Sequence, residues 1–492
     1  MHGMSRPLMK KVITVVLTTL IALMVLATSA ADIELPEIGD SAGSLISPQQ
    51  EYRIGQAFFW RLQQSVELVE DPEVVSYLSE LGNRLVANSD APQLSFNFFM
   101  VPDDTVNAFA APGGFIGVNS GLLLTSEQED ELASVLAHEI AHITQRHLLR
   151  SFEKQKQMSI PSMVGMIAGA LVGIADPKLG AAAITAIQAG GVQARINFTR
   201  NHEKEADNLG MQTLISSGFD PLAMPSFFER LQRASRFYTG NAVPEFLRTH
   251  PVTTSRIASS RSRAVQYTNQ FQPQMNEQLQ FLLIREKLRI LTSRDYSQLS
   301  QRYEAALETG SRDSKIASRY GYSLALSAMG QYSKAKSQLM QLIKQDAERL
   351  TYQLALADIE MADGNVATAL EIYRAAQRLF PDDYALSMNQ AVSLLQVEQA
   401  AEAKKILMKQ FYMGHKTQQL HKLLARAHGD MGQNSEGHQW LAEYYFNAGR
   451  FEQALDQLQL ATKFADKNEY QLAKINSRIQ AIKAIKTQVE EL

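Results

Sequence analysis

Residues 138–142 read His-Glu-Ile-Ala-His, which sets two imidazoles and one carboxylate close together in the chain. Side chains four positions apart lie on one face of an α-helix, so His138 and His142 can direct ring nitrogens at one metal ion. Glu139 then lies beside them, where its carboxylate can take a proton from water. The chain has no cysteine, so the donors are imidazole and carboxylate groups, as in hydrolytic zinc sites. The motif predicts one zinc ion per chain.

A catalytic zinc usually has three protein ligands, so one more donor must come from elsewhere. The segment from His202 to Asp207 also contains Glu203 and Glu205, and spacing alone does not choose among His202, Glu203 and Glu205. We favour Glu203 because Asp207, four residues later, shares its helical face. Asp207 then either accepts a hydrogen bond from a ligand imidazole or faces the substrate as a second catalytic carboxylate.

His250 lies in a Thr-His-Pro turn ahead of a helical segment. Its imidazole can stabilise the oxyanion that develops during peptide cleavage. It can instead fill the open metal position as a fourth ligand and act as a switch that holds the enzyme inactive. A histidine with a purely structural role in the turn is the alternative.

The metal-binding motif lies in a stretch, 126–147, with the signals of an amphipathic helix. Ser126 and Glu129 have capping-box spacing, and apolar residues recur along one face. That apolar stripe comprises Leu132, Val135, Leu136 and Ile143. Upstream we expect helices near 48–69 and 72–87 and a strand over 94–101.

A loop over 107–114 leads into a short strand ahead of the metal helix. We expect this strand to be an edge strand close to the metal, where it would hydrogen-bond an extended peptide. The residues assigned to it are Gly114, Phe115, Ile116, Gly117 and Val118. A buried hairpin without a substrate role is the alternative.

The N-terminus has the pattern of an export signal, with Arg6, Lys10 and Lys11 followed by an apolar run over 12–27 and small residues. We predict a signal peptide over 1–31 and a linker over 32–47. An uncleaved membrane anchor is the alternative, but the run is short of the roughly 20 residues that span a bilayer. The net charge of −3 argues against a nucleic-acid partner.

Residues 158–192 are rich in glycine and alanine. We expect a helical hairpin that forms a lid beside the cleft. A membrane-dipping segment, and hence a peripheral membrane contact, is one alternative, and simple core helices are the other.

From about Asn276 the composition changes and a repeat appears. Gly330, Gly364, Glu398 and Gly432 fall on a 34-residue grid, with Ala335, Ala369 and Ala403 five residues after the first three. This is the period of tetratricopeptide repeats, so we predict four to five helix pairs stacked as an all-α solenoid over 276–487. Gly449 restarts the pattern half a period after Gly432, so the last unit reuses a helix or is shifted in register.

These motifs together resemble those of the M48 family of zinc metallopeptidases over about 51–264. The resemblance rests on His-Glu-Ile-Ala-His, on Glu203-x-x-Ala206-Asp207-x-x-Gly210 and on Thr249-His250-Pro251. It implies that His138, His142 and Glu203 bind zinc. It also implies that Glu139 is the base and Asp207 the second carboxylate. The implied fold is a zincin-like α+β domain over 48–270, helix-rich with a small sheet, so that the whole chain is mostly α.

With an export signal and a repeat half, the chain most resembles periplasmic members of this family. The resemblance implies an endopeptidase and chaperone that acts on unfolded or misassembled outer-membrane β-barrel proteins and contacts the β-barrel assembly machinery through its repeats. The competing hypothesis is an assembly chaperone or adaptor that binds through the solenoid and has a largely closed metal site. A zinc hydrolase of small amides is disfavoured, because small substrates need no protein-binding repeat.

Overall fold

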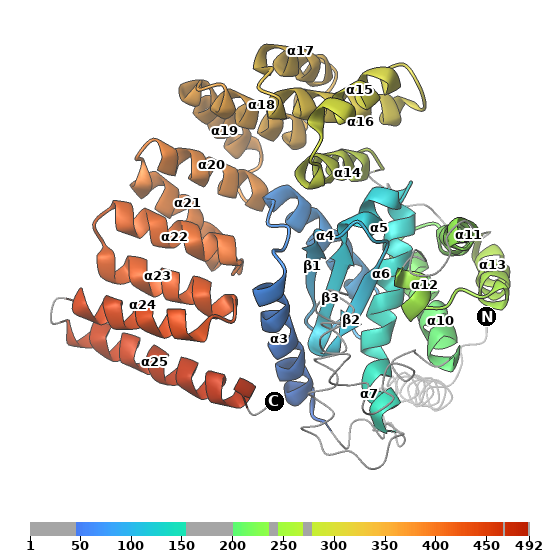
Figure 1. Cartoon of the computed structure of the whole chain (residues 1–492), viewed down its shortest axis with the longest axis horizontal. Helices are drawn as coiled ribbons and strands as arrows, with labels where there is room; N and C mark the ends of the chain where they lie inside the picture. The colour runs from blue at the N-terminus through green and yellow to red at the C-terminus, as the bar shows by residue number, and fades with distance from the viewer. Residues whose placement is uncertain (1–45, 154–199, 236–244, 269–277, 466–467, 491–492) are drawn as a thin grey trace, which may run out of the picture. The chain divides into compact units, whose positions relative to one another are not determined.

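The computed structural model of the chain describes residues 46–153, 200–235, 245–268, 278–465 and 468–490 (Figure 1). The expected signal peptide, nearly all of the expected linker and the expected Gly/Ala-rich lid lie outside these residues. In the part of the chain that is described, no helix combines the length and apolar character needed to cross a bilayer.

Helices α3 (Pro48–Ser65) and α4 (Pro72–Ala87) begin where the sequence predicts. Each has a proline in its first turn and a side-chain cap: Ser47 accepts a hydrogen bond from the Gln50 amide, and Asp71 accepts from two amides of α4. Helix α3 ends earlier than expected. Residue Val69 instead donates its amide to the Met100 carbonyl, 3.0 Å away, beside the small sheet.

The sheet has strands β1 (Asn97–Val101), β2 (Ala108–Ala111) and β3 (Phe115–Asn119) in the order β1-β3-β2. Strand β3 pairs parallel to β1 and antiparallel to β2. Between β2 and β3 is the short 3-10 turn η1 (Pro112–Gly114), where Gly113 has φ 72°. A Cβ on Gly113 would lie 2.5 Å from the Tyr52 Cα in α3, so only glycine fits there.

The expectation that Gly114, Phe115, Ile116, Gly117 and Val118 form a peptide-binding edge is therefore wrong. Strand β3 is the central strand of the described sheet and pairs on both sides. Strand β2 is an outer strand of this sheet, and it also packs against the metal helix.

Helix α5 (Ser120–Thr125) precedes the metal helix α6 (Glu129–Thr144). The predicted capping box is wrong: Ser126 ends α5, and its amide and hydroxyl both donate to the Leu122 carbonyl. At the other end, Arg146 adopts φ 51° and separates α6 from α7 (His147–Glu153). The predicted apolar stripe of α6 is buried, at Leu132, Val135, Leu136 and Ile143.

The catalytic half continues with α10 (Arg200–Ser216), α11 (Ala223–Ser235), α12 (Glu245–Thr249) and α13 (Thr254–Thr268). Helix α10 packs closely on α6: a Cβ on Gly210 would lie 3.0 Å from the His138 backbone nitrogen and 3.1 Å from the Ala137 backbone carbonyl. Helix α13 packs on both α10 and α11. A single apolar core fills the space between these helices and the sheet.

The C-terminal half is a stack of helices, as predicted. They are α14 (Gln278–Thr292), α15 (Tyr296–Ala306), α16 (Arg312–Ala328), α17 (Tyr332–Ile343), α18 (Leu350–Ala362), α19 (Val366–Leu379), α20 (Tyr384–Gln396), α21 (Ala400–Tyr412), α22 (Gln418–Asp430), α23 (Asn434–Asn447), α24 (Phe451–Lys463) and α25 (Glu469–Glu490). The expected mostly α fold with one small sheet is confirmed.

The 34-residue grid marks the turns within the helix pairs. Gly330, Gly364 and Gly432 have φ of 73°, 84° and 72°, and Glu398 adopts φ 60° at the equivalent place. Gly449 has φ 69° in the turn between α23 and α24, and α23 packs against both α22 and α24.

Helix α14 joins the two halves. It packs on α4 and α5 of the catalytic half and on α16 of the solenoid. Lys287 of α14 forms a buried ion pair with Glu73 of α4, and its Nζ lies 3.3 Å from the Asp71 carboxylate. A second contact joins α3 to the end of the solenoid, where the Trp60 ring lies 4.9 Å from that of Phe451.

Replacing Lys287 by alanine should strongly destabilise this joint, because the buried Glu73 and the partly buried Asp71 would lose their cation. We expect the free energy of unfolding, measured with urea, to fall by about 3–5 kcal/mol. The control is Lys336→Ala, which removes ion pairs nearer the surface with Glu360 and Asp363 and should cost less than about 1 kcal/mol. An equal loss in the free energy of unfolding in the two variants would contradict a special role for the buried Lys287 ion pair in joining the two halves.

Candidate metal centre

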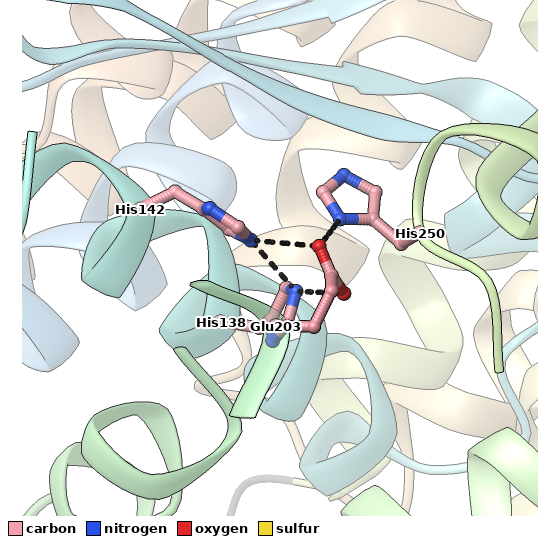
Figure 2. Close-up of side chains that lie close together, drawn as sticks. All are labelled: His138, His142, Glu203 and His250. Carbon is pink, nitrogen blue, oxygen red and sulfur yellow. Dashed lines mark hydrogen bonds and ion pairs between the residues drawn. The ribbon is translucent and has the colours of Figure 1, made fainter. Parts of the chain in front are cut away.

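Four buried side chains converge from three places in the catalytic half (Figure 2). One donor atom from each of His138, His142, Glu203 and His250 lies within 4.8 Å of the others. The Nε2 atoms of His138 and His142, on consecutive turns of α6, are 3.0 Å apart. Glu203 enters from α10, with its Oε2 3.6 Å from His138 Nε2 and its Oε1 3.6 Å from His142 Nε2. His250 follows α12, and its Nδ1 lies 3.0 Å from Glu203 Oε1.

These donors fit a small divalent cation. Donors bonded to zinc at about 2.0–2.2 Å in a tetrahedron lie about 3.3 Å from one another. The separation of 3.0 Å between the two Nε2 atoms and those of 3.6 Å from them to the Glu203 oxygens lie near that value, and all four donor atoms lie within 4.8 Å of one another. Imidazole and carboxylate groups are also the donors that zinc accepts in sites without thiolates. The group therefore meets the geometric and chemical requirements of a zinc site.

The electrostatic environment favours positive charge at the centre of the group. Burial disfavours a charged His138, but hydrogen bonds to Asp207 and Glu203 outweigh burial and raise its pKa to about 9. For His142, burial and the neighbouring His138 charge lower the pKa well below its usual value. Burial also acts to raise the pKa of Glu203, but His250 and His138 lower it well below the usual range, so Glu203 stays ionised.

Glu139 lies beside the donor atoms and is fully buried. Neither carboxylate oxygen accepts a hydrogen bond from the described residues, and His250 Nε2 is 3.5 Å from Oε1. Burial raises the pKa of Glu139, against the opposing influence of His250 and His138. A carboxylate with a raised pKa accepts a proton more readily, which suits a general base.

Asp207 lies behind His138 rather than among the donor atoms. Its Oδ1 is 3.2 Å from His138 Nδ1, and Arg256 donates to both carboxylate oxygens at 2.8 Å and 2.7 Å. Burial acts to raise the pKa of Asp207, but the hydrogen bonds to Arg256 and His138 lower it. Of the two roles that the sequence leaves open, this position favours orientation of a ligand imidazole over contact with substrate.

Arg256 of α13 is the residue that sequence reasoning missed. Besides its two bonds to Asp207, its Nη1 lies 2.6 Å from Glu203 Oε2, so one guanidinium holds two carboxylates of α10, Glu203 and Asp207. The guanidinium also lies over the Phe228 ring at 5.1 Å. The available signal was the Arg256-Ile257 pair after the Thr-His-Pro turn, which spacing alone does not connect to the metal motif.

The other candidates of the acidic segment point elsewhere. Glu205 Oε2 lies 3.0 Å from His147 Nε2 and 3.1 Å from Arg150 Nη1. The His202 ring stacks on His147 at 4.5 Å. Of the candidates in this segment, Glu203 is the one whose carboxylate reaches the donor group.

The central strand β3 is not the sheet element that lines the metal helix. Ala110 and Ala111 of β2 instead line a small apolar pocket together with His142 and Ile143. The strand nearest the donor group is therefore β2 rather than the predicted residues 114–118.

Comparison with known proteins gives two family matches. Peptidase family M48 matches residues 72–264, and a tetratricopeptide repeat matches residues 320–384. The chain is 33% identical over 453 residues to the beta-barrel assembly-enhancing protease of Yersinia pestis, covering 92% of each chain. It is 36% identical over 413 residues to a putative beta-barrel assembly-enhancing protease of Vibrio cholerae, covering 82% of this chain and 83% of the other.

A more distant relative is the mitochondrial metalloendopeptidase OMA1 of Schizosaccharomyces pombe, 33% identical over 181 residues. That match covers 37% of this chain and 50% of the relative. The comparisons confirm the predicted combination of a metallopeptidase domain and tetratricopeptide repeats.

Replacing Asp207 by asparagine should weaken metal binding, because His138 would lose the negative charge that faces its Nδ1. We expect the zinc affinity, measured by competition with a chelator, to fall by between about 10-fold and 100-fold. The control is Glu229→Gln, which removes an ion pair with Arg261 away from the site and should leave the affinity unchanged. An Asp207→Asn protein that binds zinc as tightly as wild type would refute the assignment.

Proposed function

This chain belongs to peptidase family M48, and from that premise we propose that it is a periplasmic zinc-dependent endopeptidase and chaperone for outer-membrane β-barrel proteins. The chain is a metallopeptidase by family. The observation that carries the proposal is the buried group His138, His142 and Glu203 with Glu139 beside it.

The residues around this group have the chemistry that peptide hydrolysis needs. His138, His142 and Glu203 would hold a zinc ion, which would supply the Lewis acidity to polarise the scissile carbonyl and to make water acidic enough to lose a proton near neutral pH. Glu139 takes that proton as the water oxygen bonds to the carbonyl carbon, and returns it to the amine nitrogen as the C–N bond breaks. His250, next to Glu139, is positioned to donate to the carbonyl oxygen as negative charge develops on it.

The substrate peptide is proposed to lie along β2. Strand β2 is an outer strand of the described sheet, and Ala110 and Ala111 line a pocket with His142. An extended peptide that added to this strand would run past the metal group with its backbone held by hydrogen bonds. Three of the four residues of β2 are alanines, and we propose that their small side chains leave room for the residues of the substrate.

The substrate class is proposed from the relatives. Proteins named beta-barrel assembly-enhancing proteases align over nearly the full length of this chain, including the solenoid. We carry over to this chain a role in assembling outer-membrane β-barrel proteins and in degrading misassembled ones. The solenoid is the proposed contact with the assembly machinery, because stacked repeats present extended surfaces for protein partners. The expected export signal over 1–31 accords with a periplasmic location.

A second candidate function is favoured by the place of His250. Its ring belongs to the same group of donors as His138, His142 and Glu203, so it can complete a four-ligand, closed site. In that state the protein would act mainly as an assembly chaperone or adaptor through its solenoid. The two functions differ in whether cleavage is needed in the cell.

Replacing Glu139 by glutamine should abolish cleavage while preserving fold and metal. We expect one zinc per chain by elemental analysis, and cleavage of an unfolded protein slower by about 100-fold to 10,000-fold, because the base is lost. The control is Glu127→Gln, an exposed residue before the same helix. If Glu139→Gln fully rescues cells that lack the protein, the adaptor function is the primary one.

Replacing His250 by alanine should alter the rate of cleavage without removing the metal, since three donors remain. If His250 closes the site, cleavage accelerates. If His250 stabilises the oxyanion, cleavage slows by about 100-fold or more. Zinc content and cleavage rate are measured on the same protein. Unchanged values of both would leave His250 as a structural turn residue.

A further inference from the structure

The chain leaves helix α6 through an unusual backbone conformation. Arg146 has φ 51°, in the left-handed region that non-glycine residues rarely adopt. Its side chain is anchored: Nε donates to Glu51 at 3.0 Å and Nη2 donates to the Ile46 carbonyl at 2.8 Å. A strained backbone that side-chain contacts hold in place indicates that the turn has a role in positioning the residues next to it.

The turn at Arg146 brings His147 back toward His142. In a continuous helix, residues five apart lie about 140° apart around the axis and do not touch. Here the Nδ1 atoms of His142 and His147 are 2.9 Å apart, and both rings are buried. His147 Nε2 lies 3.0 Å from Glu205 Oε2 on α10. His142 is thus connected to a carboxylate through a second imidazole.

The tautomers along this chain of contacts follow from one premise, the proposed binding of metal by His142 Nε2. His142 must then carry its proton on Nδ1 and donate to His147 Nδ1. His147 in turn carries its proton on Nε2 and donates to the Glu205 carboxylate. Each of the two contacts, His142 to His147 and His147 to Glu205, then has one donor and one acceptor.

We propose that His147, oriented by Glu205, is a positioning residue that fixes the tautomer and ring orientation of the ligand His142. The two metal-binding imidazoles of α6 are therefore supported differently. His138 Nδ1 faces the Asp207 carboxylate directly, whereas His142 reaches a carboxylate through His147. This proposal rests on the proposed function, because it concerns a metal ligand.

Two substitutions of His147 separate positioning from packing. His147→Asn places an amide oxygen where Nδ1 was, so it can still accept from His142, whereas His147→Leu fills the space without an acceptor. We expect the zinc affinity of His147→Leu, measured by chelator competition, to fall by about 10-fold to 100-fold and that of His147→Asn to stay near wild type. If His147 only packs, leucine should bind zinc at least as tightly as asparagine.

Glu205 provides a second test that does not disturb the buried ring. Its side chain is 35% exposed, so Glu205→Ala is expected to fold and to bind zinc less tightly, because His147 loses its acceptor. The matched control is Arg150→Gln, which removes the other partner of Glu205 and should leave the affinity unchanged.

The outcomes separate this proposal from the proposed function. A wild-type protein that binds no zinc overturns both. A wild-type protein that binds zinc tightly, with His147→Leu and Glu205→Ala binding equally tightly, overturns the role of His147 and leaves the proposed peptidase site intact.

Discussion

The close approach of helices α6 and α10 is the contact on which the metal centre depends. Gly210 lies against the α6 backbone at His138, where a Cβ would come within 3.0 Å of the backbone nitrogen and press the two helices apart. The same face of α10 carries Asp207 about one turn earlier and Glu203 about two turns earlier. Any residue that held the helices apart at Gly210 would move both carboxylates away from the imidazoles. The site is therefore positioned in part by a backbone packing contact to which α10 contributes no side chain.

This arrangement buries several charges in one place, and the positive charge of Arg256 offsets part of the negative charge of Glu203 and Asp207. Its guanidinium bonds to Asp207 and Glu203 at once, which neutralises part of the negative charge of α10 before any cation binds. Arg256 comes from α13 and His250 from the segment after α12. The helices behind the site therefore contribute both its geometry and its charge balance, and metal binding and packing are expected to be coupled.

Features set by local periodicity were predictable from the sequence, and features set by contacts between distant segments were not. The His-Glu-Ile-Ala-His motif followed from helical spacing, and the preference for Glu203 followed from the helical face that it shares with Asp207. The structure brings His138, His142 and Glu203 together. The repeat register followed from turn positions, and even Glu398 adopts the left-handed backbone that its place in the grid requires. The order of the strands could not be predicted from the sequence, because β3 pairs with both β1 and β2, to which it is joined by connections of different length. Arg256 and the Arg146 turn were missed for the same reason, since each acquires its role only when separate helices meet.

Helix α14 has consequences for how the molecule can be divided. Phe281 and Ile284 lie in the core of the catalytic half, while Leu283 packs in the first apolar cluster of the solenoid. Cutting the chain before Gln278 would strip an apolar cover from the catalytic half, and cutting after Thr292 would strip one from the solenoid. The two halves are thus not interchangeable modules joined by a tether. A truncated fragment from either side would expose an apolar surface that is buried in the whole chain. Binding of such a fragment to other proteins would then reflect this exposed apolar surface rather than a native binding preference.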